Sequence, residues 1–246
     1  MIHVKVLAFG MLKDALGADS ASIALPVGAT VADLLGAVVS AYPSAVLSGI
    51  AVSVNAEYAA VSAPLHDGDE VGLLPPVSGG TSRPAKTEGS SEQAQHIVTY
   101  LTREPIDSAA LIARAKHAED GAAVVFDGIV RNHSRGRRTL YLDYEAYEEM
   151  ADRQMAELAA QARARFGVRH VTIVHRLGRL DIGETSVLIV VASAHRGQAY
   201  EASRWLIDTL KQQVPIWKKE TFVDGAVWAD GEPFPSELSV EGADAP

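Results

Sequence analysis

The chain has 246 residues, of which 48% are hydrophobic and 22% charged, and this balance is typical of a globular protein that buries a core. It contains no cysteine, which excludes disulfides, thiolate-bound zinc, iron–sulfur clusters and a thiol nucleophile. No apolar run approaches the roughly 20 residues that cross a bilayer, and the N-terminus does not indicate a signal peptide. We therefore expect a cytoplasmic protein that does not enter a membrane.

The formal net charge of −9 argues against a general nucleic-acid-binding protein. The charge is unevenly distributed, because residues 1–80 hold two lysines against seven acidic side chains, whereas residues 81–246 hold 20 basic and 24 acidic ones. Basic residues gather in residues 131–138 and 211–219. Because opposite potentials steer docking, this distribution predicts that the acidic first part meets a basic surface of the second.

The first 80 residues predict a small α+β domain. Alternating apolar residues indicate strands at residues 2–9 and 20–25, which could pair as a hairpin across a short helical turn. Thr30 is a candidate N-cap for an amphipathic helix that ends before Tyr42. Two further strands, residues 51–55 and 71–74, complete a ββαββ order. This order is that of a β-grasp, ubiquitin-like fold.

The composition changes abruptly after an apolar segment that ends in Gly79–Gly80. The residues that follow are rich in Ser, Thr, Gly, Lys and Glu without periodic apolar positions, which is typical of a linker. The C-terminal residues are acidic and also lack a pattern. The expected organisation is a first domain of residues 1–80, a linker of residues 81–94, a second domain of residues 95–235 and a tail of residues 236–246.

The second domain alternates strand and helix patterns and is expected to be α+β. Predicted strands cover residues 96–101, 121–131, 139–146, 171–177 and 186–194. Predicted helices begin at the N-cap Asp107, at Tyr147 and at Gln198, and the second of them ends at Gly167. Residues 132–138 are expected to form a polar, basic loop, and residues 215–220 to close the core.

Cationic residues fall at the ends of these elements. Arg131 follows a strand, His195 and Arg196 lie between a strand and a helix, and Lys211 and Lys218 flank a proline-containing turn. Backbone N–H groups and the helix dipole add to side-chain charge at such positions. Each residue taken alone is more typical of a solvated or structural side chain. Together they predict a site for a small phosphorylated anion.

Two segments near the end of the first domain carry a resemblance. Residues 67–71 (DGDEV) followed by residues 74–80 (LPPVSGG) resemble the C-terminus of the small subunit of molybdopterin synthase, a ubiquitin-like sulfur carrier. The resemblance implies that the carbonyl of Gly80 is adenylylated and converted to a thiocarboxylate, which carries sulfur without cysteine. It implies no metal and no tightly bound cofactor. Two glycines suit this task because a thin, flexible strand can enter a narrow channel.

Six strings in the second domain resemble the large, catalytic subunit of the same family, and the chain as a whole resembles a natural fusion of the two subunits. The resemblance implies an α/β hammerhead-type domain for the second part. The strings are residues 126–131 (FDGIVR), 142–147 (LDYEAY), 175–178 (HRLG), 183–184 (GE), 195–196 (HR) and 210–220 (LKQQVPIWKKE).

The function implied by the resemblance is sulfur transfer to cyclic pyranopterin monophosphate (precursor Z), giving the dithiolene of molybdopterin in molybdenum cofactor biosynthesis. Catalytic roles are implied for Lys211, Lys218 and Gly80, with acid–base chemistry at Lys211 favoured over a covalent link. The implied substrate-binding residues are Ile129, Val130, Arg131, His195, Arg196, Lys211, Lys218, Lys219 and Glu220. We expect Tyr144, Glu145, Tyr147 and Trp217 to serve packing instead.

The resemblance also implies partners: an adenylylating enzyme, a sulfur donor and a second copy of the chain bound through the second domain. Because Thr81 follows Gly80, no free carboxylate exists until the chain is cut, so a processing protease is expected as well. No nucleic acid or membrane is expected.

Three other hypotheses remain open. The second domain could act on a different substrate, or the carrier domain could serve another pathway such as thiamine synthesis, which the second-domain strings argue against. The first domain could also be an uncleaved, non-catalytic ubiquitin-like module that regulates the second, with sulfur supplied by a separate carrier.

Overall fold

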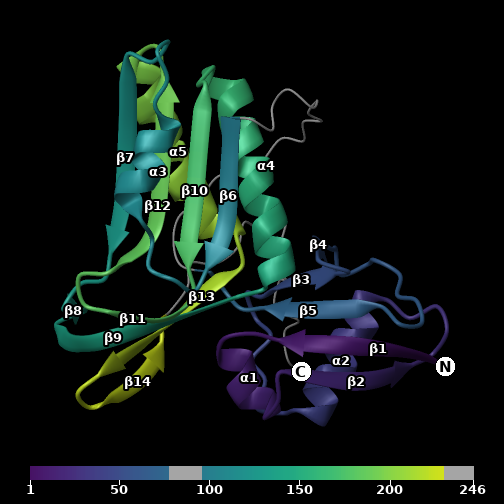
Figure 1. Ribbon diagram of the computed structural model, residues 1–246. Helices are drawn as coiled ribbons and strands as arrows, with labels where there is room; N and C mark the ends of the chain where they lie inside the picture. The colour runs from purple at the N-terminus through teal and green to yellow at the C-terminus, as the bar shows by residue number, and fades with distance from the viewer. Residues whose placement is uncertain (78–95, 230–246) are drawn as a thin grey trace. The chain divides into compact units, whose positions relative to one another are not determined.

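A computed structural model of the chain describes residues 1–77 and 96–229 (Figure 1). These residues form two compact units, of which the second ends at Val227, and Trp228 is grouped with the first. The first unit has one sheet and the second has two, and each unit has its own hydrophobic core. The Gly79–Gly80 pair, the proposed linker of residues 81–94 and the proposed tail of residues 236–246 lie outside the described residues, so these assignments stay predictions.

The first unit is a five-stranded sheet with the order β2-β1-β5-β3-β4. The first strand pairs antiparallel with the second and parallel with the last, which places the two ends of the unit side by side in the sheet and confirms the β-grasp prediction. Its elements are β1 (Ile2–Ala8), α1 (Met11–Leu16), β2 (Ser20–Leu25), α2 (Val31–Ala41), β3 (Ala51–Val54), β4 (Glu57–Tyr58) and β5 (Glu70–Leu74).

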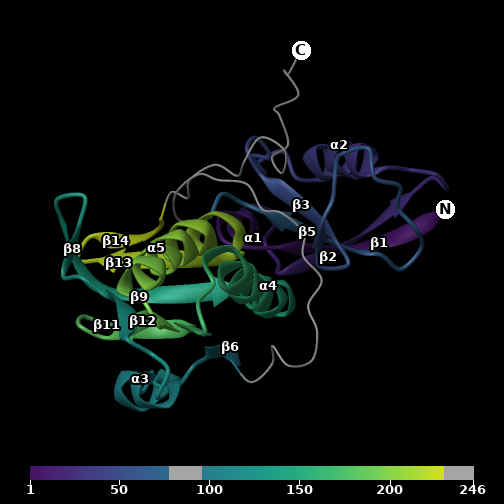
Figure 2. The ribbon, with the colours of Figure 1, turned by 90° about the horizontal axis from the view of Figure 1, so that it is seen from above.

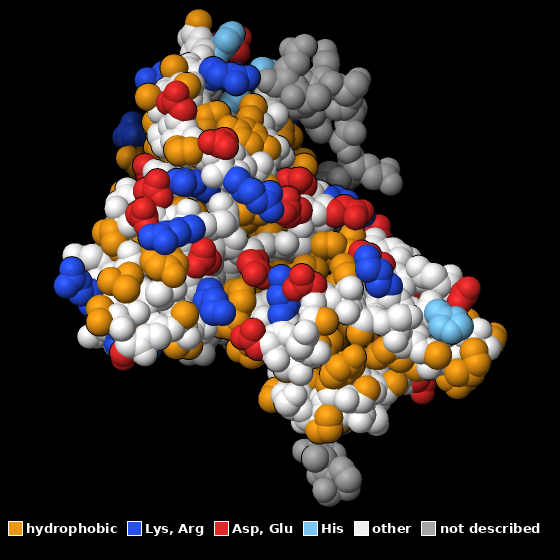
Figure 3. Space-filling model, turned by 60° about the horizontal axis from the view of Figure 1, so that its bottom comes forward, with side chains coloured by type: hydrophobic (Ala, Val, Ile, Leu, Met, Phe, Trp, Pro, Cys, Tyr) orange, Lys and Arg blue, Asp and Glu red, His pale blue; other side chains and the backbone are white. Residues whose placement is uncertain are grey.

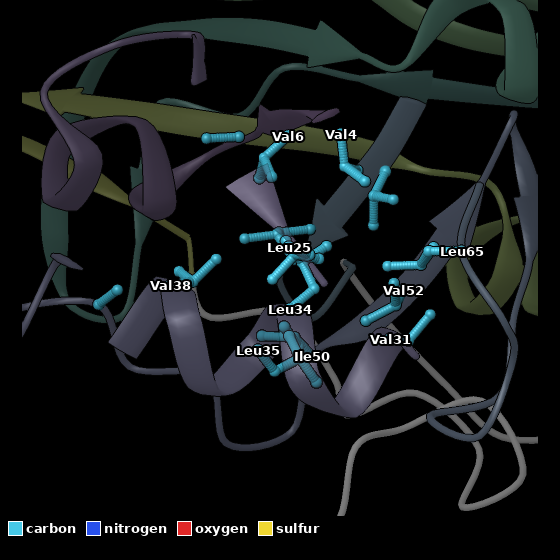
Figure 4. Close-up of a cluster of buried hydrophobic side chains, with 14 of the residues drawn as sticks. Val4, Val6, Leu25, Val31, Leu34, Leu35, Val38, Ile50, Val52 and Leu65 are labelled. Atoms are coloured by element: carbon cyan, nitrogen blue, oxygen red, sulfur yellow. The ribbon is translucent and has the colours of Figure 1, made fainter. Parts of the chain in front are cut away.

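Helix α2 packs its apolar side against the sheet of the first unit. It begins as predicted at Thr30, whose backbone N and Oγ1 each donate a hydrogen bond of 2.8 Å to the Asp33 carboxylate. Figure 4 shows Val31, Leu34 and Val38 of the helix beside apolar side chains of the strands, and all three are fully buried. This core holds the final strand, β5, from which the chain continues toward Gly79–Gly80.

The second unit has a four-stranded sheet with the order β6-β10-β12-β7 and a five-stranded sheet that contains β11-β9-β13-β14, with β8 paired to β9. Its elements are β6 (Ile97–Thr102), α3 (Ser108–Ala115), β7 (Ala122–Ile129), β8 (His133–Ser134), β9 (Arg137–Ala146), α4 (Glu148–Phe166), β10 (His170–Arg176), β11 (Gly178–Asp181), β12 (Thr185–Ser193), α5 (Arg196–Gln213), β13 (Ile216–Phe222) and β14 (Gly225–Trp228).

Helices cover both faces of the four-stranded sheet (Figure 2). Helices α4 and α5 pack on the face that carries Ile173 and Ile189, whereas α3 packs on the face that carries Val174 and Leu188. Residues of β12 are therefore buried on both faces, which explains its continuous apolar run. The predicted N-cap is confirmed, since Asp107 Oδ1 accepts from the Ala110 backbone N at 2.9 Å.

The predicted loop over residues 132–138 was wrong in part, because β8 and the start of β9 form a hairpin there. The two turn residues, Arg135 and Gly136, both have positive φ values (49° and 76°), as a tight two-residue hairpin turn requires. Strands β11 and β14 were not predicted from the sequence either. They are four residues long and depend on pairing with β9 and β13.

None of the described helices combines the length and the apolar character needed to cross a bilayer.

Candidate active site

Lys218 and Glu220 lie on one face of β13 and form an ion pair, with 3.1 Å between Lys218 Nζ and Glu220 Oε1. Their side chains are 26% and 9% exposed, so the carboxylate is nearly buried and depends on a cationic partner. Strand β13 pairs antiparallel with β9, which places Lys218 opposite Tyr144 and Glu220 opposite Leu142. The strand pairing therefore fixes the backbone position from which the Lys218 side chain extends.

The segment Ile129–Arg131 lies where β7 leaves the four-stranded sheet. Val130 is buried, its backbone N donates to Glu184 O at 3.0 Å, and its carbonyl accepts from the Gly183 backbone N at 2.9 Å. These two bonds fix the backbone on which the exposed Arg131 and Ile129 side chains stand.

Tyr144 joins these two parts of the site. It packs against a small buried cluster of Val130, Leu142 and Leu180, and it is also the strand partner of Lys218. The structure therefore brings the Ile129–Arg131 segment and the Lys218–Glu220 pair into one region, where β7 meets the β11-β9-β13 sheet.

Beneath Tyr144 lies His175, whose ring meets the tyrosine ring edge-on with 5.0 Å between centroids. Burial lowers the pKa of His175 to about 4, so this imidazole is neutral at neutral pH. His175 Nδ1 lies 3.0 Å from the Arg176 carbonyl, to which it can donate in the corresponding tautomer. The sequence strings included both His175 and Tyr144, but only the ring contact in the folded unit shows that they support the same site.

Lys211 is exposed in the last turn of α5, between the buried residues Leu210 and Gln212. Only Val214 and Pro215 separate α5 from β13, so Lys211 and Lys218 belong to the same end of the unit. Pro215 is held because its carbonyl accepts from the Tyr147 backbone N at 3.1 Å. A lysine at a helix C-terminus also faces the negative end of the helix dipole.

His195 and Arg196 lie at the opposite end of α5, with His195 at the N-cap position. The strand before them ends at Ser193, which pairs with Ala122 at the start of β7, whereas Arg131 follows the end of β7. At a rise of about 1.5 Å per residue, Arg196 and Lys211 are separated by roughly 22 Å along the helix. One copy of the chain therefore does not bring His195 and Arg196 together with Lys211 and Lys218.

Of the expected packing residues, Tyr147 and Trp217 are buried, whereas Tyr144 and Glu145 are half-buried. On the face shown in Figure 3, Lys and Arg side chains are interspersed with Asp and Glu and form no single large patch of one sign. Within residues 1–77 and 96–229, no group of three or more His, Asp or Glu side chains is arranged to hold a metal ion. The expectation that no cofactor is tightly bound stays a prediction.

Comparison with known proteins gives two family matches. Residues 101–213 match the model described as "MoaE protein", and residues 6–80 match the "ThiS family". A molybdopterin synthase catalytic subunit of Halalkalibacterium halodurans is 41% identical over 143 residues, which are 58% of this chain and 91% of the relative. The Bacillus subtilis (strain 168) protein of the same name is 44% identical over 128 residues, or 52% of this chain and 82% of the relative.

Among solved structures, a crystal structure described as molybdopterin synthase from Staphylococcus aureus is similar to the second unit. It has a TM-score of 0.50 and 38% sequence identity, and it covers 57% of this chain and 98% of that one.

Proposed function

This chain belongs to the family of molybdopterin synthase catalytic subunits, and from that premise we propose that it transfers sulfur from Gly80 to cyclic pyranopterin monophosphate, forming the dithiolene of molybdopterin. Membership of this family assigns the chain to molybdenum cofactor biosynthesis. The observation that carries the proposal is the fusion itself, because the ThiS-family match ends at Gly80 and is followed in the same chain by the catalytic subunit. A cytoplasmic location stays a prediction.

The proposed chemistry needs a nucleophilic sulfur and a site for an anionic substrate. The sulfur of a Gly80 thiocarboxylate would displace an oxygen from a substrate carbon and form a thioester. Hydrolysis of that thioester would leave the sulfur on the substrate and a carboxylate on Gly80 that can be charged again. Because a dithiolene contains two sulfurs, two such transfers are needed. Arg131 and Lys218 are suited to hold the cyclic phosphate through charge-assisted hydrogen bonds, with Ile129, Val130, Lys219 and Glu220 shaping the surroundings. Lys211 is proposed as the acid–base group, in preference to a covalent role.

The separation of His195 and Arg196 from Lys211 supports a site shared between two copies. Strand β7 is an edge of its sheet, and Val125 and Ile129 on it are exposed hydrophobic residues, as expected of a surface that meets a second copy. In this proposal His195 and Arg196 of one copy complete the site that holds Lys211 and Lys218 of the other.

Complementation between inactive variants tests the shared site. Lys211→Ala and His195→Ala should each abolish conversion of cyclic pyranopterin monophosphate to molybdopterin without unfolding the protein, while Arg204→Ala on the exposed surface of α5 should leave turnover unchanged. Co-refolding the two inactive variants at equal amounts should restore about a quarter of wild-type turnover, because half of the dimers then carry one intact site. Near-normal turnover by Lys211→Ala would contradict a catalytic role for Lys211. Failure of the two variants to complement would contradict a site shared between two copies.

Intact-mass measurement on the protein from its own host tests the sulfur carrier. We expect a fragment ending at Gly80 whose mass indicates that one oxygen has been replaced by sulfur. Uncut chain together with full activity would contradict this. That outcome would favour the second candidate, in which an uncleaved ubiquitin-like module regulates the catalytic unit and a separate carrier supplies sulfur. The observation that supports this second candidate is the amide bond between Gly80 and Thr81, because an uncut chain has no free carboxylate at Gly80.

The activating enzyme, the sulfur donor and the processing protease are proposed as the further partners of Gly80.

A further inference from the structure

A pocket of about 220 Å³ opens on the face of the four-stranded sheet that α3 covers. Its floor is formed by β6 and β10 together with the flanking His96 and Arg169, and its wall by the end of α3 and the turn that follows. Helix α5, which carries Lys211, packs on the other face of the same sheet. The pocket is therefore separate from the candidate active site.

The lining of this pocket is strongly basic. Arg114, Lys116 and Arg169 contribute to it, as do three histidines, and no acidic side chain is among the described residues that line it. Arg114 and Lys116 are exposed, and within the described part of the chain neither forms an ion pair. Their charges are available to a ligand.

Arg169 has a structural role in the pocket, because its guanidinium is already hydrogen-bonded within the protein. Its guanidinium donates from Nε to Asp120 Oδ1 at 2.8 Å, from Nη2 to Asp120 Oδ2, and from Nη2 to the Ala115 carbonyl at 2.5 Å. The Asp120 carboxylate also accepts from the His117 backbone N at 2.8 Å, so it ties the turn after α3 to the start of β10. The Asp120 carboxylate is thus already committed, and the Arg169 hydrogen bond holds its pKa below the usual range. A second carboxylate, that of the exposed Glu119, lies 3.9 Å from Nδ1 of the lining residue His117.

The part of the floor formed by His170 and Thr172 is polar but uncharged at neutral pH. His170 is buried, and its Nε2 lies 2.8 Å from Thr172 Oγ1. Burial, together with the charges of Arg169 and His96, lowers the pKa of His170 to about 4. Two apolar residues, Val98 and Leu111, complete the lining and can contact an organic group.

We propose that this pocket binds a small phosphate ester, with the phosphate held by Arg114 and Lys116 and the organic part resting on Val98 and Leu111. The volume of about 220 Å³ has room for a phosphate with a short organic group. An arginine and a lysine that line the same pocket can donate to several acceptor oxygens of a phosphate. The site is independent of the proposed sulfur transfer.

Titration of the full-length chain with inorganic phosphate and with glycerol 3-phosphate, followed by amide chemical shifts at constant ionic strength, tests the proposal. We expect saturable shifts of the Val98 and Thr172 amides, with the ester binding more tightly than inorganic phosphate. Arg114→Gln should weaken binding by about tenfold, as expected for the loss of one charge-assisted contact. Arg204→Gln, which removes a helix-surface arginine far along the chain on α5, is the matched control and should leave the affinity unchanged.

Shifts that do not saturate, equal weakening by Arg114→Gln and Arg204→Gln, or an ester that binds no more tightly than inorganic phosphate would each overturn the proposal. Because both arginines are exposed at helix surfaces, neither substitution is expected to unfold the protein, and the unshifted amides of each variant report this directly.

Discussion

The guanidinium of Arg176 and the carboxylate of Glu184 lie 2.9 Å apart and join the end of β10 to the turn before β12. Glu184 also accepts from the Asp181 backbone N at 2.7 Å, and its carbonyl holds the Val130 backbone N. The hydrogen bond from Arg176 keeps the pKa of Glu184 below its usual range. This ion pair therefore supports the backbone that presents Arg131, although neither partner was assigned a role from the sequence.

Replacing Arg176 by methionine should destabilise the protein and disturb the Val130 turn. The Arg176 side chain is only 11% exposed, so its loss leaves Glu184 without its main partner, at a cost of roughly 1–3 kcal/mol in the free energy of unfolding. Urea denaturation measures this cost, and amide shifts should concentrate at Val130 and Gly183. The side chain of Arg204 is 86% exposed, and its ion pair lies in solvent. Arg204→Met should therefore lower the free energy of unfolding by less than about 0.5 kcal/mol. Equal costs for the two variants would contradict the assignment.

Glu220→Gln should lower turnover in the proposed reaction by releasing Lys218 from its fixed position. The amide keeps the shape of Glu220 but removes the charge that holds the Lys218 amine at 3.1 Å. We expect a fall in kcat together with a loss of stability of about 1–3 kcal/mol. Glu201→Gln replaces an exposed glutamate on α5 and serves as the matched control. Unchanged kcat in Glu220→Gln would show that the ion pair does not position Lys218 for the reaction.

The two buried histidines should make stability fall as the pH is lowered from about 6.5 to about 4. In the folded protein, burial lowers the pKa of His170 and of His175 to about 4, from the ordinary value of 6.5. Between these two pH values the unfolded chain binds more protons, so the free energy of unfolding decreases with decreasing pH. For His175 the full effect is on the order of 3 kcal/mol.

Stability measured by urea denaturation across this pH range checks the prediction. His175→Phe keeps an aromatic ring next to Tyr144 and should flatten the dependence, whereas Tyr144→Phe removes only a hydroxyl and should leave the slope as it is. If His175→Phe retained the wild-type slope, His175 would not contribute to the pH dependence.

Two glycines of the first unit should respond in opposite directions to alanine. A Cβ added at Gly72 in β5 would lie 2.6 Å from Ser53 Oγ on the neighbouring strand, so Gly72→Ala should destabilise the unit by about 1–3 kcal/mol. Gly36 lies on the exposed side of α2 with open space around it, and Gly36→Ala should stabilise by about 0.5–1 kcal/mol through helix propensity. Thermal unfolding followed by resonances of the first unit compares them, and shifts of the same sign would refute the packing argument.

Sequence patterns were sufficient where local chemistry decides the structure. Thr30 and Asp107 were predicted as N-caps because short polar side chains satisfy free backbone N–H groups, and Gly167 was predicted to end α4 because it adopts positive φ. The hairpin at Arg135–Gly136 was missed although a glycine at its second turn position was visible. Its first turn residue is an arginine, which rarely adopts the positive φ that the turn requires.

The candidate site was only partly predictable, because its geometry depends on strand register. Tyr144 and His175 are far apart in the sequence and meet because β11, the strand that follows β10, pairs with β9 and places Gly178 opposite Tyr144. Likewise, cations at the ends of elements were identified correctly, but the sequence did not reveal that α5 sets His195 and Lys211 at opposite ends. Which cations share a site follows from the order and direction of the elements, and these are tertiary properties.

The first unit ends in a way that limits how Gly80 can be reached. Strand β5 ends at Leu74, and Val77, still buried, is only three residues before Gly80. Three residues span at most about 11 Å. An enzyme that adenylylates, thiolates or cuts at Gly80 must therefore bring its reacting atoms close to the β-grasp body, so the surface of that body becomes part of what each enzyme recognises. Because only three residues separate Val77 from Gly80, several different enzymes would have to recognise the same surface of the first unit.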